Sequence, residues 1–130
     1  MSVFCDLHNH STYSDGTNTP AELVAIAEKI GLGAIALTDH NTVAGLPEFL
    51  AAAEGKSVRA IAGTEFSTDY KGTELHILGL FLRPEHYAPI TDLLEDYRMR
   101  KEKSNLDLTE KLNAAGYAID YEKIKSSNLL

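Results

Sequence analysis

The chain has 130 residues, of which 44% are hydrophobic and 24% are charged, values typical of one globular domain with its own core. Its 12 basic and 19 acidic residues give a net charge of −7, which argues against a non-specific binder of nucleic acid or of membrane surfaces. We expect no membrane association and no stable DNA binding. A nucleotide substrate is still allowed, because divalent ions bound in a cleft can reverse the local charge.

Cys5 is the single cysteine, so an internal disulfide is excluded and a reducing, cytoplasmic location is expected. It follows Phe4 in an apolar stretch, which predicts a buried and unreactive thiol. The first residues lack the basic and apolar runs of a signal peptide, and no apolar run is long enough to span a membrane.

Apolar runs and breaker residues predict alternating strands and helices in the first two thirds of the chain. A capping box at Thr19–Glu22 begins a helix that Gly31 ends, and a second helix is expected over 42–54. The polar stretch 67–73 predicts a turn. Strands are expected over 3–8, 34–38, 58–63 and 74–82. This order favours a parallel α/β sheet or barrel, in which sites form at the carboxyl ends of the strands.

After Pro84 the pattern becomes helical. A long helix with a break near Ser104–Asn105 is expected, followed by a short helix from Asp120 to Ser126. His86 is interpreted as a surface or capping residue at the start of this region. The charged stretch 98–103 is interpreted as a solvated helix face.

Six side chains suited to metal binding lie in or just after the predicted strands. His8 and His10 are two residues apart, so in an extended chain their side chains point to the same side. A turn at 14–16 can return the Asp15 carboxylate toward them. The later strands add His40, Glu65 and His76. Because Mn, Fe and Zn accept imidazole and carboxylate ligands, the pattern predicts a site for several divalent ions.

Four motifs in this order resemble the PHP (polymerase and histidinol phosphatase) family of metal-dependent phosphoesterases, in its small stand-alone form. They are Asp6–Gly16, Thr38–Asn41, Gly63–Glu65 and Leu75–Gly79. The resemblance implies an α/β fold that is the N-terminal part of a distorted (βα)7 barrel over residues 1–84. Residues 85–130 would begin a helical insertion.

By position, the resemblance implies a centre of two to three divalent ions of Mn, Fe or Zn. Its catalytic residues would act through these ions. His8 and His10 would bind the first ion, Asp15 and His40 the second, and His76 the third. Glu65 would bridge the first and third ions. Asp39, beside His40, would orient a ligand without binding an ion itself.

The activity implied is hydrolysis of a phosphate ester by a hydroxide that bridges two metal ions. The implied partner is a small phosphorylated substrate, such as a nucleotide or the 5′ end of a short RNA. Histidinol phosphate is an alternative substrate in the same reaction class. Alternatives from other classes are a catalytically incomplete metal-binding or regulatory module of the PHP type, and a metal-dependent amidohydrolase. The amidohydrolase usually needs a bridging lysine, and no lysine here follows a predicted strand in that role.

The family pattern continues to a further His, an Asp and another His, which this sequence does not contain. We therefore expect the 130 residues to be an inactive fragment, or to complete the site by self-association or exchange with another chain. Arg98 and Arg100 are candidates for binding the substrate phosphate, but we interpret both as solvated.

Overall fold

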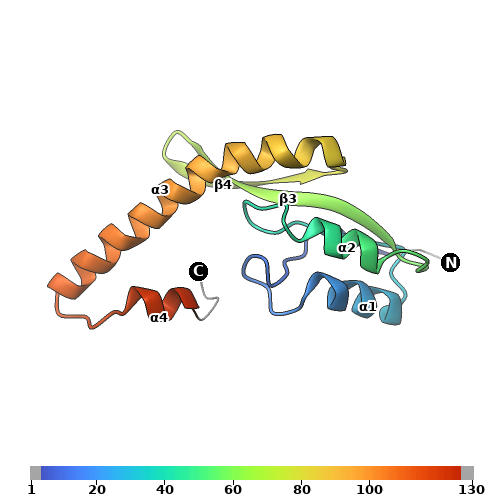
Figure 1. Cartoon of the computed structure of the whole chain (residues 1–130), viewed down its shortest axis with the longest axis horizontal. Coiled ribbons are helices and arrows are strands. Elements are labelled where there is room, and N and C mark those ends of the chain that lie inside the picture. The colour runs from blue at the N-terminus through green and yellow to red at the C-terminus, as the bar shows by residue number, and fades with distance from the viewer. Residues whose placement is uncertain (1–3, 127–130) are drawn as a thin grey trace.

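The computed structural model describes residues 4–126, in which two strand–helix units precede a β-hairpin and two final helices (Figure 1). In chain order the elements are β1 (Cys5–Asp6), α1 (Pro20–Ile30), β2 (Ala34–Leu37), α2 (Leu46–Ala52), β3 (Arg59–Tyr70), β4 (Thr73–Leu80), the 3₁₀ turn η1 (Pro84–His86), α3 (Tyr87–Ala114) and α4 (Tyr121–Ser126). Val3, which the sequence placed in the first strand, lies outside the described residues. No helix within 4–126 is both long and apolar enough to cross a membrane.

The four strands form one curled sheet in the order β1–β2–β3–β4. The first three are parallel, as predicted, but β4 is antiparallel to β3. Lys71 and Gly72 have φ angles of 53° and 80°, the left-handed conformations that a two-residue hairpin turn needs. The predicted turn over 67–73 is therefore wrong except at these two residues, since Ser67 to Tyr70 pair with β4.

The main core lies between the sheet and the helices α1 and α2, which lie side by side (Figure 1). The large side chains of β2 lie on one face of the sheet and its small side chains on the other. Ile35 and Leu37 pack into this core, whereas Ala34 and Ala36 pack against Ile61 on the opposite face. All four residues of β2 are buried, which confirms the prediction of a strand covered on both faces.

The bounds of the first two helices follow from their end residues. The capping box at Thr19 begins α1, and Gly31 ends it with a φ of 77°, as the sequence predicted. α2 is shorter than the expected 42–54. Asn41 has a φ of 50°, a left-handed conformation that is not helical, so the chain before Leu46 does not extend the helix. Pro47 lies in the first turn of α2, where the N–H that proline lacks would have no partner within the helix.

Cys5 is exposed, so the expected buried thiol is wrong. The strand β1 has only two residues and lies at one edge of the sheet. Phe4, immediately before it, is 71% exposed. Other parts of the described chain therefore do not cover this edge of the sheet, and the Cys5 side chain stays exposed.

α3 is one continuous helix of 28 residues, and the predicted break at Ser104–Asn105 is wrong. Two weak helix formers cost only about half a kcal/mol each, which a helix of this length tolerates. His86 accepts a hydrogen bond from the N–H of Arg83 at 3.1 Å, which confirms its expected capping role. α3 extends beyond the sheet, and α4 runs back beside it (Figure 1).

Candidate metal centre

The segment that contains His8 and His10 is held beside the carboxyl end of β2. The backbone N–H and the hydroxyl of Thr38 both donate to the carbonyl of Asn9, at 2.8 and 3.1 Å. The side-chain amide of Asn9 donates in turn to the carbonyl of Ala36 at 3.3 Å. These hydrogen bonds keep the chain beside β2 after β1 has ended at Asp6. Both histidines therefore lie at the end of the sheet.

The strands β3 and β4 bring the remaining ligand-type side chains to the same place. The N–H of Glu65 donates to the carbonyl of Asp39 at 3.1 Å, and His40 pairs with Glu65 in an isolated parallel bridge. In the hairpin, Ser67 faces His76. Since side chains two apart share a face, Glu65 and His76 project to the same side.

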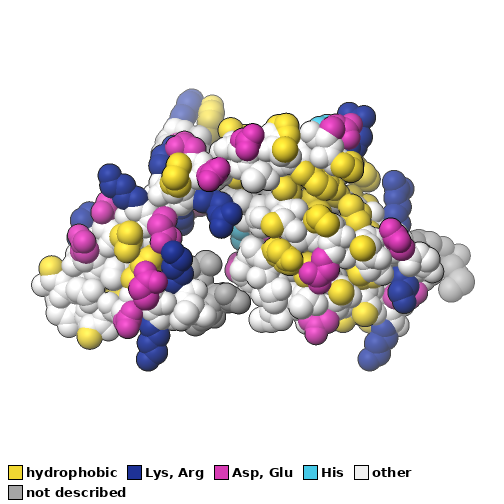
Figure 2. Space-filling model, in the orientation of Figure 1, with side chains coloured by type: hydrophobic (Ala, Val, Ile, Leu, Met, Phe, Trp, Pro, Cys, Tyr) yellow, Lys and Arg dark blue, Asp and Glu magenta, His cyan; other side chains and the backbone are white. Residues whose placement is uncertain are grey.

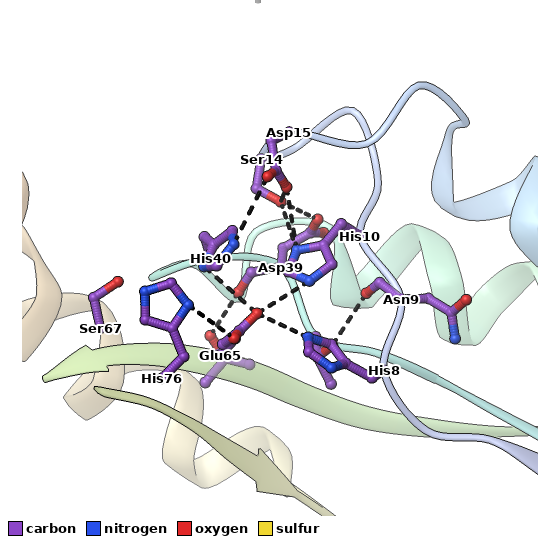
Figure 3. Close-up of polar contacts among 12 residues, drawn as sticks. His8, Asn9, His10, Ser14, Asp15, Asp39, His40, Glu65, Ser67 and His76 are labelled. Atoms are coloured by element: carbon purple, nitrogen blue, oxygen red, sulfur yellow. Dashed lines mark hydrogen bonds and ion pairs between the residues drawn. The ribbon is translucent and has the colours of Figure 1, made fainter. Parts of the chain in front are cut away.

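The Glu65 carboxylate lies at the centre of four imidazole rings (Figure 3). Glu65 is only 4% exposed. Its Oε2 lies 2.9 Å from His8 Nε2, 3.0 Å from His10 Nε2 and 3.5 Å from His40 Nδ1, and its Oε1 lies 3.1 Å from His76 Nδ1. Successive rings along this arc have centroids 4.5 to 5.1 Å apart. The five side chains are thus close enough to share ions.

Asp15 closes the cluster from the loop after β1 (Figure 3). Its two carboxylate oxygens lie 3.2 Å from His10 Nδ1 and 3.7 Å from His40 Nε2. The tight turn that returns Asp15 depends on Gly16, whose N–H donates to the carbonyl of Ser11 at 2.9 Å. A Cβ at Gly16 would lie 2.1 Å from the carbonyl oxygen of His10, so only glycine fits there.

Asp39 holds this loop and is itself buried, with 2% exposure. Its carboxylate accepts three hydrogen bonds of 2.6 Å, from the N–H and the hydroxyl of Ser11 and from the hydroxyl of Ser14. Ser14 also lies 3.4 Å from His10 Nδ1. These contacts tie Asp39 to the loop that carries His10 and Asp15, and the sequence pattern did not indicate the two serines that make them.

Within residues 4–126, the cluster contains three overlapping groups whose ligand atoms all lie within 4.8 Å of one another. The groups are His8–His10–Glu65, His10–Asp15–His40 and His40–Glu65–His76. Each combines two imidazoles with one carboxylate, a donor set that suits Mn, Fe and Zn. The side chains present therefore fit a centre of divalent ions.

Burial and neighbouring charge set the protonation of two members. Burial lowers the pKa of His10 below its ordinary value of 6.5, and the nearby His40 adds to that shift. Burial opposes ionisation of Glu65, but the hydrogen bond from His8 and the charges of the surrounding histidines hold the pKa of Glu65 below its ordinary value of 4.5. Both shifts favour the forms that bind cations: neutral imidazole and ionised carboxylate.

These shifts predict that acid destabilises the metal-free protein. A lowered pKa means that the folded state binds fewer protons than the unfolded state, so stability is present above the ordinary values of 6.5 and 4.5 and is lost as the pH falls through the lowered ones. We expect the melting temperature to fall between pH 7 and pH 4. The fall above pH 5 should be smaller in His10→Gln, and a melting temperature that rises on acidification would contradict the assignment.

A pocket of about 500 Å³ adjoins the cluster and reaches toward α3 and α4. Asp15, His40 and His76 line it on one side, and Arg98 and Lys101 of α3 also line it. Every residue of the stretch 98–103 except Glu102 is exposed, as expected for a solvated helix face, and Arg98 and Lys101 also border this pocket. The three-residue spacing of Arg98 and Lys101 places both on one side of a helix, but it does not indicate that this side borders a pocket.

The fold and the cluster together define a mixed α/β domain with a candidate metal centre at the ends of its strands. Residues 6–124 match the family model of the PHP domain, and the chain belongs to this family.

Three known proteins illustrate the similarity. The 5′-3′ exoribonuclease of Haemophilus influenzae is 39% identical over 126 residues, which are 97% of this chain and 46% of that protein. The 3′,5′-nucleoside bisphosphate phosphatase of Chromobacterium violaceum is 35% identical over 113 residues, or 87% of this chain and 39% of that protein. A solved structure from Bifidobacterium adolescentis, assigned as a metal-dependent phosphoesterase, has a TM-score of 0.81 at 26% identity and covers 99% of this chain and 44% of its own. The chain thus spans less than half the length of these relatives.

Proposed function

We propose that the whole protein is a metal-dependent phosphoesterase that hydrolyses phosphate esters. The observation that carries this proposal is the ring of four histidines around one buried carboxylate, which adjoins a pocket with cationic residues in its wall. The names of two relatives support the same class, because an exoribonuclease and a nucleoside bisphosphate phosphatase act on phosphate esters of RNA and of a nucleotide.

The chain's own residues would prepare this reaction in distinct ways. Glu65 and the four histidines would hold two to three ions of Mn, Fe or Zn, with Asp15 as a further ligand. Bound ions of this kind lower the pKa of water and neutralise charge on a phosphoryl group. Asp39 would position the loop that carries His10 and Asp15. No side-chain nucleophile is needed.

The substrate that we infer is a nucleotide or the 5′ end of a short RNA. We also propose that residues 1–84 form the N-terminal part of a (βα)7 barrel of the PHP type, and that residues 85–130 begin an insertion over the site. Self-association or exchange with another chain would be one way to complete the barrel. Histidinol phosphate is the second substrate to test, since it offers the same phosphate monoester.

Two other functions make different predictions. A regulatory PHP-like module would bind ions without turnover. An amidohydrolase would cleave cyclic amides and usually needs a bridging lysine, but among residues 4–126 no lysine forms an ion pair with Glu65 or Asp15. We therefore favour ester hydrolysis over both.

Metal removal tests the proposal. Dialysis of the whole protein against a chelator is expected to reduce hydrolysis of adenosine 5′-monophosphate to the background rate, and added Mn²⁺ is expected to restore it. A parallel assay with a cyclic amide separates the amidohydrolase. Hydrolysis that survives complete metal removal, or cleavage of the amide alone, would contradict the proposed function.

A further inference from the structure

Within residues 4–126, Arg98 and Lys101 line the pocket without an acidic partner, unlike two other cations near them. Lys125, which also lines the pocket, forms an ion pair with Glu102 at 2.6 Å. Arg100, on another side of α3, forms an ion pair with Asp96 at 2.9 Å. Across the described part of the chain, no ion pair forms at Arg98 or at Lys101. The positive charges of Arg98 and Lys101 can therefore interact with a ligand in the pocket.

The acidic side chains that line the pocket are already engaged. Glu102 accepts hydrogen bonds from the Tyr121 hydroxyl at 2.8 Å and from Lys125 at 2.6 Å. Glu74 lies 3.4 Å from His76 Nε2. Asp15 faces His10 in the candidate metal centre. The α3 side of the pocket consequently carries net positive charge, in a chain whose net charge is −7.

The position of this positive charge relates it to the metal centre. Arg98 and Lys101 line the same pocket as Asp15, His40 and His76. Figure 2 shows Lys or Arg side chains beside a hollow in which a His side chain is visible. A ligand held at the cluster can therefore extend toward α3 without leaving the pocket.

We propose that Arg98 and Lys101 are specificity-determining residues that bind a second anionic group of the substrate. This group is separate from the phosphate ester at the metal centre, so the inference rests on the proposed function. A guanidinium presents paired N–H donors to phosphate oxygens, and an ammonium adds a mobile point charge. The pair would favour substrates with two anionic groups over those with one.

The first test compares two substrates that differ by one phosphate, adenosine 3′,5′-bisphosphate and adenosine 5′-monophosphate. In the double variant Arg98→Ala/Lys101→Ala, the ratio of kcat/KM for the bisphosphate to that for the monophosphate is expected to fall about 10- to 100-fold. The dinucleotide pApA shows whether a phosphodiester can serve as the second group. The matched control is Arg100→Ala, which removes an arginine from the same helix and should keep the wild-type ratio. An unchanged ratio in the double variant, or an equal fall in the control, would overturn the proposal.

The second test does not depend on turnover. Inorganic pyrophosphate is titrated into the metal-free whole protein, and the side-chain N–H signal of Arg98 is followed by NMR. We expect this signal to shift, and the signal of Arg100 to stay. If the wild type hydrolyses no phosphate ester but the Arg98 signal shifts, the proposed function fails and the anion site stands. If esters are hydrolysed but the Arg98 signal does not respond, the function stands and this proposal is overturned.

Discussion

Replacing Glu65 with glutamine is expected to reduce kcat/KM for phosphate esters by about a thousandfold or more, because the carboxylate belongs to two of the three ligand groups. Glutamine keeps the size of the side chain but removes the negative charge that faces four imidazoles. Metal content measured by elemental mass spectrometry should fall with the activity. Circular dichroism should remain that of the folded protein, since the backbone bonds of β3 do not change.

The control for this variant is Glu54→Gln, which removes an exposed carboxylate just beyond α2. It should keep both activity and metal content within about twofold of the wild type. Near-normal phosphatase activity in Glu65→Gln would contradict a metal-binding role for this carboxylate. Loss of activity with full metal content would indicate that Glu65 acts in turnover without being needed for binding.

Asp39→Ala is expected to lower the free energy of unfolding by about 3–5 kcal/mol, because three donors lose their acceptor in a buried site. Ser11, with 0% exposure, would retain an N–H and a hydroxyl that water cannot reach. The loop that carries His10 and Asp15 would then be free to move. Metal affinity is expected to fall about 10- to 100-fold, the usual effect of removing a group that orients ligands.

Urea unfolding and metal titration measure these two effects. Asp39→Asn is the companion variant, since it keeps one acceptor oxygen and should lose less stability than Asp39→Ala. If the alanine variant loses less than about 1 kcal/mol, the three short hydrogen bonds do not hold the loop in the way proposed. If it loses stability but keeps wild-type metal affinity, Asp39 supports the fold without positioning ligands.

Much of the cluster could be predicted because its members lie either close together in the sequence or near the predicted strands. His8 and His10 share a side of an extended segment, and a strand end places His40 beside them. Glu65 was expected to follow a strand, but it lies inside β3, which continues to Tyr70. The residue was recognised all the same, since its motif identifies it independently of the strand bounds.

The hairpin and the pocket could not be predicted in the same way. Lys71–Gly72 is a weaker turn signal than Asn-Gly or Asp-Gly, so the polar end of β3 resembled a loop. The placement of Arg98 and Lys101 depends on how α3 crosses the sheet and on where α4 returns. Such long-range geometry leaves no periodic trace in the sequence, and a charged helix face looks the same whether it borders water or a pocket.

Anomalous diffraction from crystals of the Mn²⁺-loaded whole protein tests the central claim most directly. We predict at least two peaks among the three ligand groups, each about 2.0–2.3 Å from imidazole nitrogens and a carboxylate oxygen. One of them should lie against Glu65 between His8 and His10. Crystals that show Mn²⁺ elsewhere but none within bonding distance of Glu65 would contradict a metal centre at this site.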